Sequence, residues 1–450
     1  MSPATDTSAN FGDKEPLHNR LPSGCTSPFH FLDEDESEYM KLIQRPIRDF
    51  FPTFAAAFEE QSPAERERGR CALIDFTPQG CKITSFVDSA DLNNSLAGTP
   101  SSHNYIPGKA PQRRLFILED LPCNYILALG SKLRVPPSFF AGHWNDPASS
   151  TFNHRNPFQR FSLPQFQIRY AAANQVRVDD HAQSDNGLMR LYAFNTNVSR
   201  YFHEFSPKGV AYDEVWSYHV MSFWASQTRG DGSWDAVLLV DPPPEKFVRC
   251  LTTWRLIPLR PRWQSESSSH FLNPPLDDNR ELSNNPANWK NQYRKSQYIS
   301  MFNDIVQFYS SGDFPYSNTV SPLCAVELPR KLVISTMIAY IRGRYLNLVT
   351  FQRTQQRPHT LRSNYLCNFS NSSFSSWSDE FFDFMFGACA AMKEFKREVE
   401  EDMTALGLDT QSYAAPQWEV DGWKSFRDLT CAVEEMTVAF AANYLSYITI

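Results

Sequence analysis

The chain has 450 residues, of which 42% are hydrophobic and 14% aromatic, so it is long enough to bury a substantial core. Its 43 Lys and Arg residues are set against 50 Asp and Glu residues, and no dense basic segment occurs. This balance excludes an electrostatic footprint for nucleic acid or anionic lipid, and it argues against a nucleic-acid-binding protein.

The N-terminal segment is polar and rich in Pro, Ser, Thr, Asp and Asn, which predicts a disordered tail over 1–38. It has no apolar core that could serve as a signal peptide, so we expect a cytoplasmic protein. The acidic run 33–36 precedes a helical region that Pro46 and Pro52 should break into shorter pieces. Such a run can attract Mg²⁺ or Ca²⁺, but adjacent acids more often form a solvated helix start, which we favour.

A β-hairpin is predicted next, with strands over 71–76 and 82–87 joined by the turn 77–80. Cys71 and Cys81 could face each other across it. The nine cysteines are odd in number, however, and neither a CxxC pair nor a zinc-like Cys/His spacing occurs. Free, mostly buried thiols in a reducing compartment are therefore the favoured interpretation.

The segment 113–144 has the clearest pattern in the chain. It predicts a buried strand over 115–118, followed by a turn and a helix that begins at Pro122. Pro136 and Pro137 should end that helix. One helix face is formed by Ile126, Leu129 and Leu133.

A second ordered pattern covers 215–244. Residues 218–224 and 236–240 are typical of strands, and Asp231 with Gly232 provides the turn between them. The second strand is apolar on both faces, as expected for an interior strand of a covered sheet. Three consecutive prolines follow it.

In hydrophobic pattern and residue sequence, 113–144 and 215–244 resemble the soluble domain of the CorA-like magnesium transporter family, in the divergent form common in filamentous fungi. A looser resemblance covers 327–450. The resemblance implies an α/β domain over 39–355, with a mixed sheet flanked by helices. Members of that family continue into a stalk helix and two membrane spans, and they assemble as pentamers around a cation pore. Their Gly-Met-Asn signature does not occur in this sequence.

Helical periodicity dominates the C-terminal part. A broad apolar face covers 331–351, and we expect a loop and a stalk-like helical hairpin over 356–450, packed against the α/β domain or extending from it. The uncharged stretch 436–450 is shorter than the roughly 20 apolar residues of a membrane span, so we predict no direct membrane insertion. The apolar stripe residues of the three helices are Val333, Ile334, Met337, Ile338, Ile341, Tyr345 and Leu348, then Phe381, Met385, Ala388, Met392, Phe395, Val399 and Met403, then Trp423, Phe426, Val433, Met436, Phe440 and Tyr447.

Motifs that carry known chemistry are missing. The sequence has no GxSxG, GxxxxGK[ST], GxGxxG or HExxH. His143 could act as a ligand or an acid–base group, but a packed histidine is favoured. Asp241 follows an interior strand, where α/β folds often keep functional carboxylates, but a turn cap is favoured there. The sequence therefore assigns no catalytic residue and indicates no cofactor, and Mg²⁺ stays a possible ligand.

Three interpretations follow. The favoured one is a non-catalytic binding or regulatory module, linked to divalent cation transport by descent, that forms a homo-oligomer or binds a membrane-spanning CorA-like homologue through its C-terminal helices. The second is an accessory protein or enzyme of fungal metabolism that reuses the scaffold. The third is a truncated gene model of a membrane CorA-like cation transporter.

Overall fold

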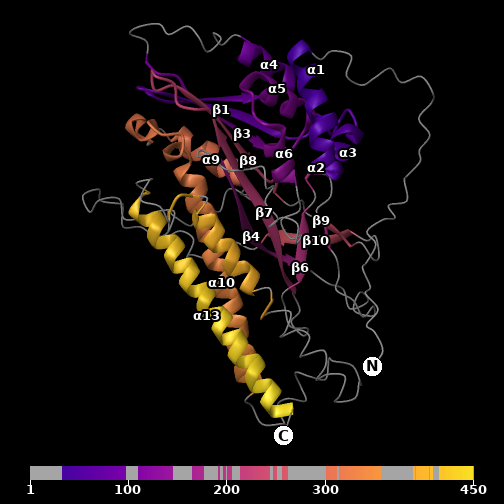
Figure 1. Ribbon diagram of the computed structural model, residues 1–450, viewed down its shortest axis with the longest axis vertical. Coiled ribbons are helices and arrows are strands. Elements are labelled where there is room, and N and C mark those ends of the chain that lie inside the picture. Colours follow the sequence, from indigo (N-terminus) through magenta and orange to yellow (C-terminus); the bar gives the residue numbers. More distant parts are fainter. Residues whose placement is uncertain are drawn as a thin grey trace, which may run out of the picture.

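The fold is α/β, with helices on both faces of a mixed sheet, as predicted (Figure 1). It is seen in a computed structural model of the chain. The residues that the structure describes are 33–97, 110–144, 165–176, 191–192, 196–198, 200–204, 213–243, 247–250, 256–261, 300–311, 314–355, 389–390, 392–404, 406–408 and 415–448.

The sheet has ten strands among the described residues. Strands β3 and β8 pair in parallel at its centre, and the other described pairings are antiparallel. All seven residues of both central strands are buried, which explains their uninterrupted apolar runs. The order is β2 (Gly80–Phe86), β1 (Arg70–Thr77), β3 (Arg113–Glu119), β8 (Trp234–Val240), β7 (Asp213–Ala225), β4 (Gln165–Val176), β10 (Leu256–Pro261), β9 (Phe247–Cys250), β5 (Leu191–Tyr192) and β6 (Tyr201–Glu204).

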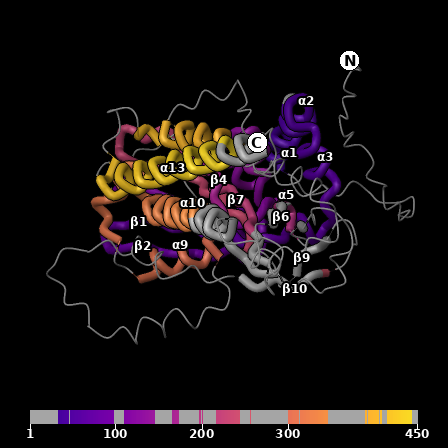
Figure 2. The backbone as a smooth tube through the Cα atoms, turned by 90° about the horizontal axis from the view of Figure 1, so that it is seen from below, coloured from indigo at the N-terminus to yellow at the C-terminus, as the bar shows by residue number. Residues whose placement is uncertain are grey.

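The N-terminal helices cover one face of the sheet (Figure 2). The predicted breaks are confirmed, because a π-helical turn over Ile43–Ile47 interrupts the first helix and α3 begins at Pro52. The predicted hairpin and the helix after Pro122 are also confirmed. These helices are α1 (Glu34–Leu42), α2 (Arg48–Phe50), α3 (Pro52–Glu60), α4 (Ser89–Ala97), α5 (Cys123–Leu133) and α6 (Pro137–Trp144).

The acidic run 33–36 forms the N-cap and the first turn of helix α1, so an ordered element begins inside the stretch predicted as a tail; 1–32 lie outside the described residues. Asp33 caps the helix in a capping box with Glu36. The ammonium group of Lys132 on α5 lies 2.6 Å from Asp33 and 2.9 Å from Asp35. The run therefore starts a helix and fastens it to α5.

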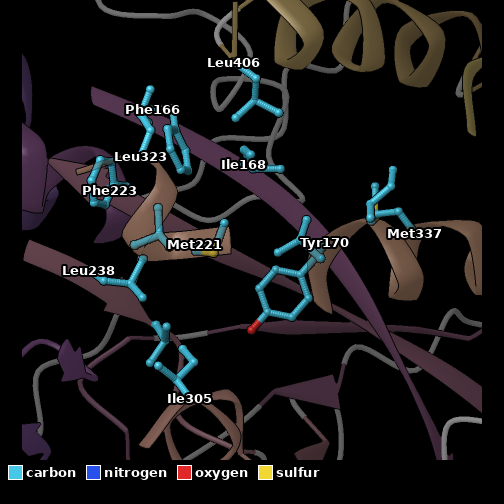
Figure 3. Packing of buried hydrophobic residues seen from close by; sticks show 14 of the residues in the cluster. Phe166, Ile168, Tyr170, Met221, Phe223, Leu238, Ile305, Leu323, Met337 and Leu406 are labelled. Carbon is cyan, nitrogen blue, oxygen red and sulfur yellow. The ribbon is translucent and has the colours of Figure 1, made fainter. Parts of the chain in front are cut away.

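The C-terminal helices cover the other face and share one core with the sheet (Figure 3). Tyr345 departs from the predicted stripe, because it is 40% exposed. Arg330 and Glu419 join α10 to α13 in an ion pair that is closed to solvent. These elements are α9 (Met301–Ser310), α10 (Glu327–Gln355), a helix over 392–404 and α13 (Gln417–Ile448). The buried residues of the predicted stripes are Val333, Ile334, Met337, Ile338, Ile341, Met392, Phe395, Val399, Met403, Trp423, Phe426 and Val433.

The hairpin over 356–450 stays a prediction, because its first part, 356–388, lies outside the described residues. The helix over 392–404 does contact α13, since Phe395 and Phe426 meet edge to face with ring centroids 5.6 Å apart. Within the described parts of the chain, we find no helix with the length and apolar character that a membrane span requires.

Candidate functional site

A buried polar cluster lies where strands β8 and β6 meet the same side of β7 (Figure 1). β8 pairs with β7 over 221–225, and β6 pairs with it over 215–217. Because β8 and β6 both run antiparallel to β7, the end of one strand faces the start of the other. Asp241 directly follows β8 and Arg200 directly precedes β6, so both side chains lie at the gap between these strands.

The carboxylate of Asp241 is the centre of this cluster. Arg200 donates from Nε to Oδ2 at 2.6 Å and from Nη2 to Oδ1 at 2.7 Å. The backbone N–H of Val220, in the part of β7 between its pairings with β8 and β6, donates to Oδ2 at 2.9 Å. Arg200 also donates to the carbonyl oxygen of His143 at 2.8 Å, in the last turn of α6. The ion pair thus closes the gap in the sheet and caps a helix C-terminus.

Two imidazoles flank the same carboxylate. The Nε2 atom of His143 lies 3.1 Å from Oδ1 of Asp241, and the Nδ1 atom of His219 lies 3.3 Å from Oδ2, neither of them in an aligned hydrogen bond. The second nitrogen of each ring meets a hydroxyl oxygen, that of Ser222 at 2.9 Å from His143 and that of Ser217 at 2.7 Å from His219. The result is a serine–histidine–carboxylate–histidine–serine chain.

Burial and charge act in opposite directions on this carboxylate. Burial alone would raise the pKa of Asp241, but the guanidinium of Arg200 and the contacts with both imidazoles hold it well below its ordinary value. Burial lowers the pKa of His143, with a further lowering from Arg200, although contact with Asp241 raises it. The cluster at neutral pH therefore combines an ionised Asp241 with a neutral His143.

A second buried carboxylate, Asp120, directly follows the neighbouring parallel strand β3. It accepts hydrogen bonds from the backbone N–H groups of Asn197 at 2.8 Å and Val198 at 2.9 Å. Burial raises its pKa to about 7, although these amides lower it. Its φ of 66° lies in the left-handed region, which Asp tolerates better than most residues. Asp120 and Asp241 thus hold the same short segment that leads into β6.

The connectivity of Ser217, His219 and Asp241 is that of a Ser-His-Asp triad, with the hydroxyl on Nε2 and the carboxylate on Nδ1. However, Ser217 has no exposed surface and the carboxylate is already bound on both oxygens by Arg200. A nucleophile must meet its substrate, and this hydroxyl is closed to solvent. The arrangement therefore acts as a buried polar network that fixes neighbouring elements.

The structure brings together the two residues that the sequence raised separately. His143 is a packed histidine, as favoured, and it contacts Asp241. The favoured turn-capping role of Asp241 is wrong, because its carboxylate forms the buried ion pair with Arg200 instead. Three further residues of the site, Arg200, His219 and Asp120, were not predicted from the sequence. Of these, Asp120 had a signal, because it follows a buried strand in the same way as Asp241 does.

Metal chemistry finds no support in this cluster, since no group of three or more His, Cys, Asp or Glu side chains among the described residues could hold a metal ion. No family model matches the chain, and no curated protein matches it.

Proposed function

We propose that this chain is a non-catalytic binding or regulatory module, related by descent to the soluble domain of CorA-like magnesium transporters. The observation that carries the proposal is the closed state of the Asp241 network. The side chains of Asp241 and His143 are 0% exposed, and that of Arg200 is 2% exposed. Buried charges that satisfy one another stabilise an arrangement of elements, whereas a catalytic site keeps reactive groups open to substrate.

The placement of the resembling stretches supports the descent. The first contains β3, α5 and α6, and the second contains β7 and β8. β3, β8 and β7 are neighbours at the centre of the sheet. If the chain shares its fold with that family, the two resembling stretches should lie side by side in the central sheet although they are far apart in sequence. Association with a second copy or with a membrane-spanning homologue through the C-terminal helices belongs to the same proposal.

A link to divalent cations is tested by ligand-dependent stability. A ligand that binds only the folded chain stabilises it by RT ln(1 + [L]/Kd). With a dissociation constant of about 0.1–1 mM, 10 mM Mg²⁺ would add about 1.4–2.7 kcal/mol. We expect the melting temperature or the sedimentation coefficient to rise with Mg²⁺. Equal ionic strength supplied as KCl is the control, and curves that coincide for Mg²⁺, Ca²⁺, Co²⁺ and KCl contradict metal sensing.

A serine hydrolase is the second candidate, favoured by the triad-like connectivity at Ser217. A fluorophosphonate probe distinguishes the two candidates, because it labels an activated, accessible serine. We expect no labelling of the native chain, since this hydroxyl is buried. Labelling that Ser217→Ala removes and Ser222→Ala keeps would favour the hydrolase and contradict the non-catalytic proposal.

A further inference from the structure

Strand β2 forms one end of the sheet and, among the described residues, pairs only with β1. The hairpin register places Thr77 opposite Gly80 across a two-residue turn. In such a hairpin the pair next to the turn is hydrogen-bonded, and bonded and non-bonded pairs alternate from there. The backbone N–H and C=O groups of Cys81, Ile83 and Ser85 therefore point away from β1. No hydrogen bond joins these groups to the part of the chain that the structure describes.

This edge has few of the features that usually protect a sheet edge from pairing. Its seven residues contain no proline, and the register with β1 is continuous, without a bulge. Lys82 is its single charged residue. Val87, which directly follows the strand, is 89% exposed. The strand also lies next to β1 and beside α9, at one end of the sheet (Figure 2).

We propose that β2 pairs antiparallel with β2 of a second copy of this chain, about a two-fold axis at Ile83. This surface is separate from the C-terminal helices of the proposed function. The register places Cys81 opposite Ser85 of the partner subunit and Ile83 opposite Ile83 of the partner subunit. The three outward-facing residues are symmetric about that axis, so each meets another outward-facing residue, giving about six hydrogen bonds.

Charge supports the second copy as the occupant. In this register Lys82 lies opposite Thr84 of the partner subunit, so the lysines of the two strands are not opposed. Like charges placed directly opposite one another destabilise a strand pair, and opposite charges stabilise it. A register shifted by two residues, centred on Lys82, would oppose both lysines. The register centred on Ile83 therefore keeps the two lysines apart.

The charge rule gives a matched pair of variants. Thr84→Lys opposes two lysine pairs across the axis, and Thr84→Glu creates two Glu–Lys pairs at the same positions. We expect Thr84→Lys to raise the dimer dissociation constant roughly five- to thirtyfold and Thr84→Glu to lower it by less. Sedimentation equilibrium measures both, and unchanged melting temperatures of the dilute monomers confirm that each variant folds.

Cross-linking tests the register itself. In Ser85→Cys, the new thiol lies opposite Cys81 of the partner subunit, with Cα atoms about 5.5 Å apart, a separation that suits a disulfide. In the control Thr84→Cys, the new thiol lies opposite Lys82 of the partner subunit. We expect oxidation to cross-link Ser85→Cys dimers and to leave Thr84→Cys at the wild-type level.

Three results would overturn the proposal. One is a chain that stays monomeric at about 100 µM. Another is a dimer that both Thr84 variants leave unchanged. The third is slow hydrogen exchange at the amides of Cys81, Ile83 and Ser85 in the dilute monomer, because another segment of the same chain would then occupy the edge.

Discussion

Asp120 and Asp241 occupy equivalent places directly after two adjacent parallel strands, yet their surroundings differ. Each directly follows its strand, each is buried, and each holds the segment that leads into β6. Asp241 has the guanidinium of Arg200 as its counter-ion, whereas the carboxylate of Asp120 accepts hydrogen bonds from the backbone amides of Asn197 and Val198. The pKa of Asp241 is lowered well below its ordinary value, and that of Asp120 is raised to about 7.

This difference shows that burial does not decide the charge of a carboxyl group by itself. Burial raises the pKa at both positions. Backbone amides offset only part of that effect at Asp120, whereas the full charge of Arg200 reverses it at Asp241. The same segment is therefore held by one carboxyl group that is charged at neutral pH and by one whose pKa lies near 7.

The largest effect is expected when the counter-ion is removed. Arg200→Met leaves the Asp241 carboxylate buried without its cation, which should cost about 3–5 kcal/mol of unfolding free energy at pH 7. The pKa of Asp241 should then rise, as that of Asp120 does, so the loss should shrink on acidification. Urea denaturation at pH 7 and pH 5 measures both effects.

An exposed ion pair provides the control. Arg48 and Glu59 are joined on the surface with side chains 49% and 30% exposed, so Arg48→Met should cost less than about 1 kcal/mol. The interpretation of the Asp241 network fails if the Arg200 variant loses no more stability than this control.

A pH-dependent effect is expected at Asp120. Its pKa is about 7 in the folded chain and about 3.9 when unfolded, so between these values the folded chain binds more protons and stability falls as pH rises. Asp120→Asn cannot ionise, so that fall should disappear. The stability that is lost between pH 4 and pH 7 should shrink by up to roughly 4 kcal/mol. Because the amide also loses one backbone contact, the slope and not the absolute stability is diagnostic. Parallel curves for the two chains would contradict a raised pKa.

The central fold could be predicted from sequence because its signals are local. The apolar run 237–240 and the strand 115–118 indicated interior strands, and Pro46 and Pro52 indicated helix breaks. The shared core of the C-terminal helices with the sheet was left open, since an apolar stripe does not specify its partner. Tyr345 fitted the predicted stripe but is exposed. Helical spacing alone does not show where along a helix the packed part of its apolar face ends.

The site could be predicted only in fragments. His143 and Asp241 were raised as single residues, but their contact depends on the end of α6 reaching the end of β8. Arg200 lies in a short segment without periodicity, so nothing local indicated its burial. Ser217 and His219 are two residues apart on one strand, which does not distinguish a polar network from a solvent-facing edge.

The smallest effect is expected at His143, with a sign opposite to that at Asp120. Burial lowers its pKa, so below the unfolded value of about 6.5 the unfolded chain binds more protons, and stability is lost as pH falls. His143→Gln should cost about 1 kcal/mol at pH 8, where the hydrogen bond with Ser222 is lost, and less at pH 5. The control Ser222→Ala removes the same bond without removing the titrating ring, so its cost should change little with pH. A cost of His143→Gln that is equal at both pH values would show that this ring contributes packing alone. His143→Gln should therefore change the pH dependence of stability in the direction opposite to that of Asp120→Asn. On unfolding, His143 gains a proton, whereas Asp120 loses one.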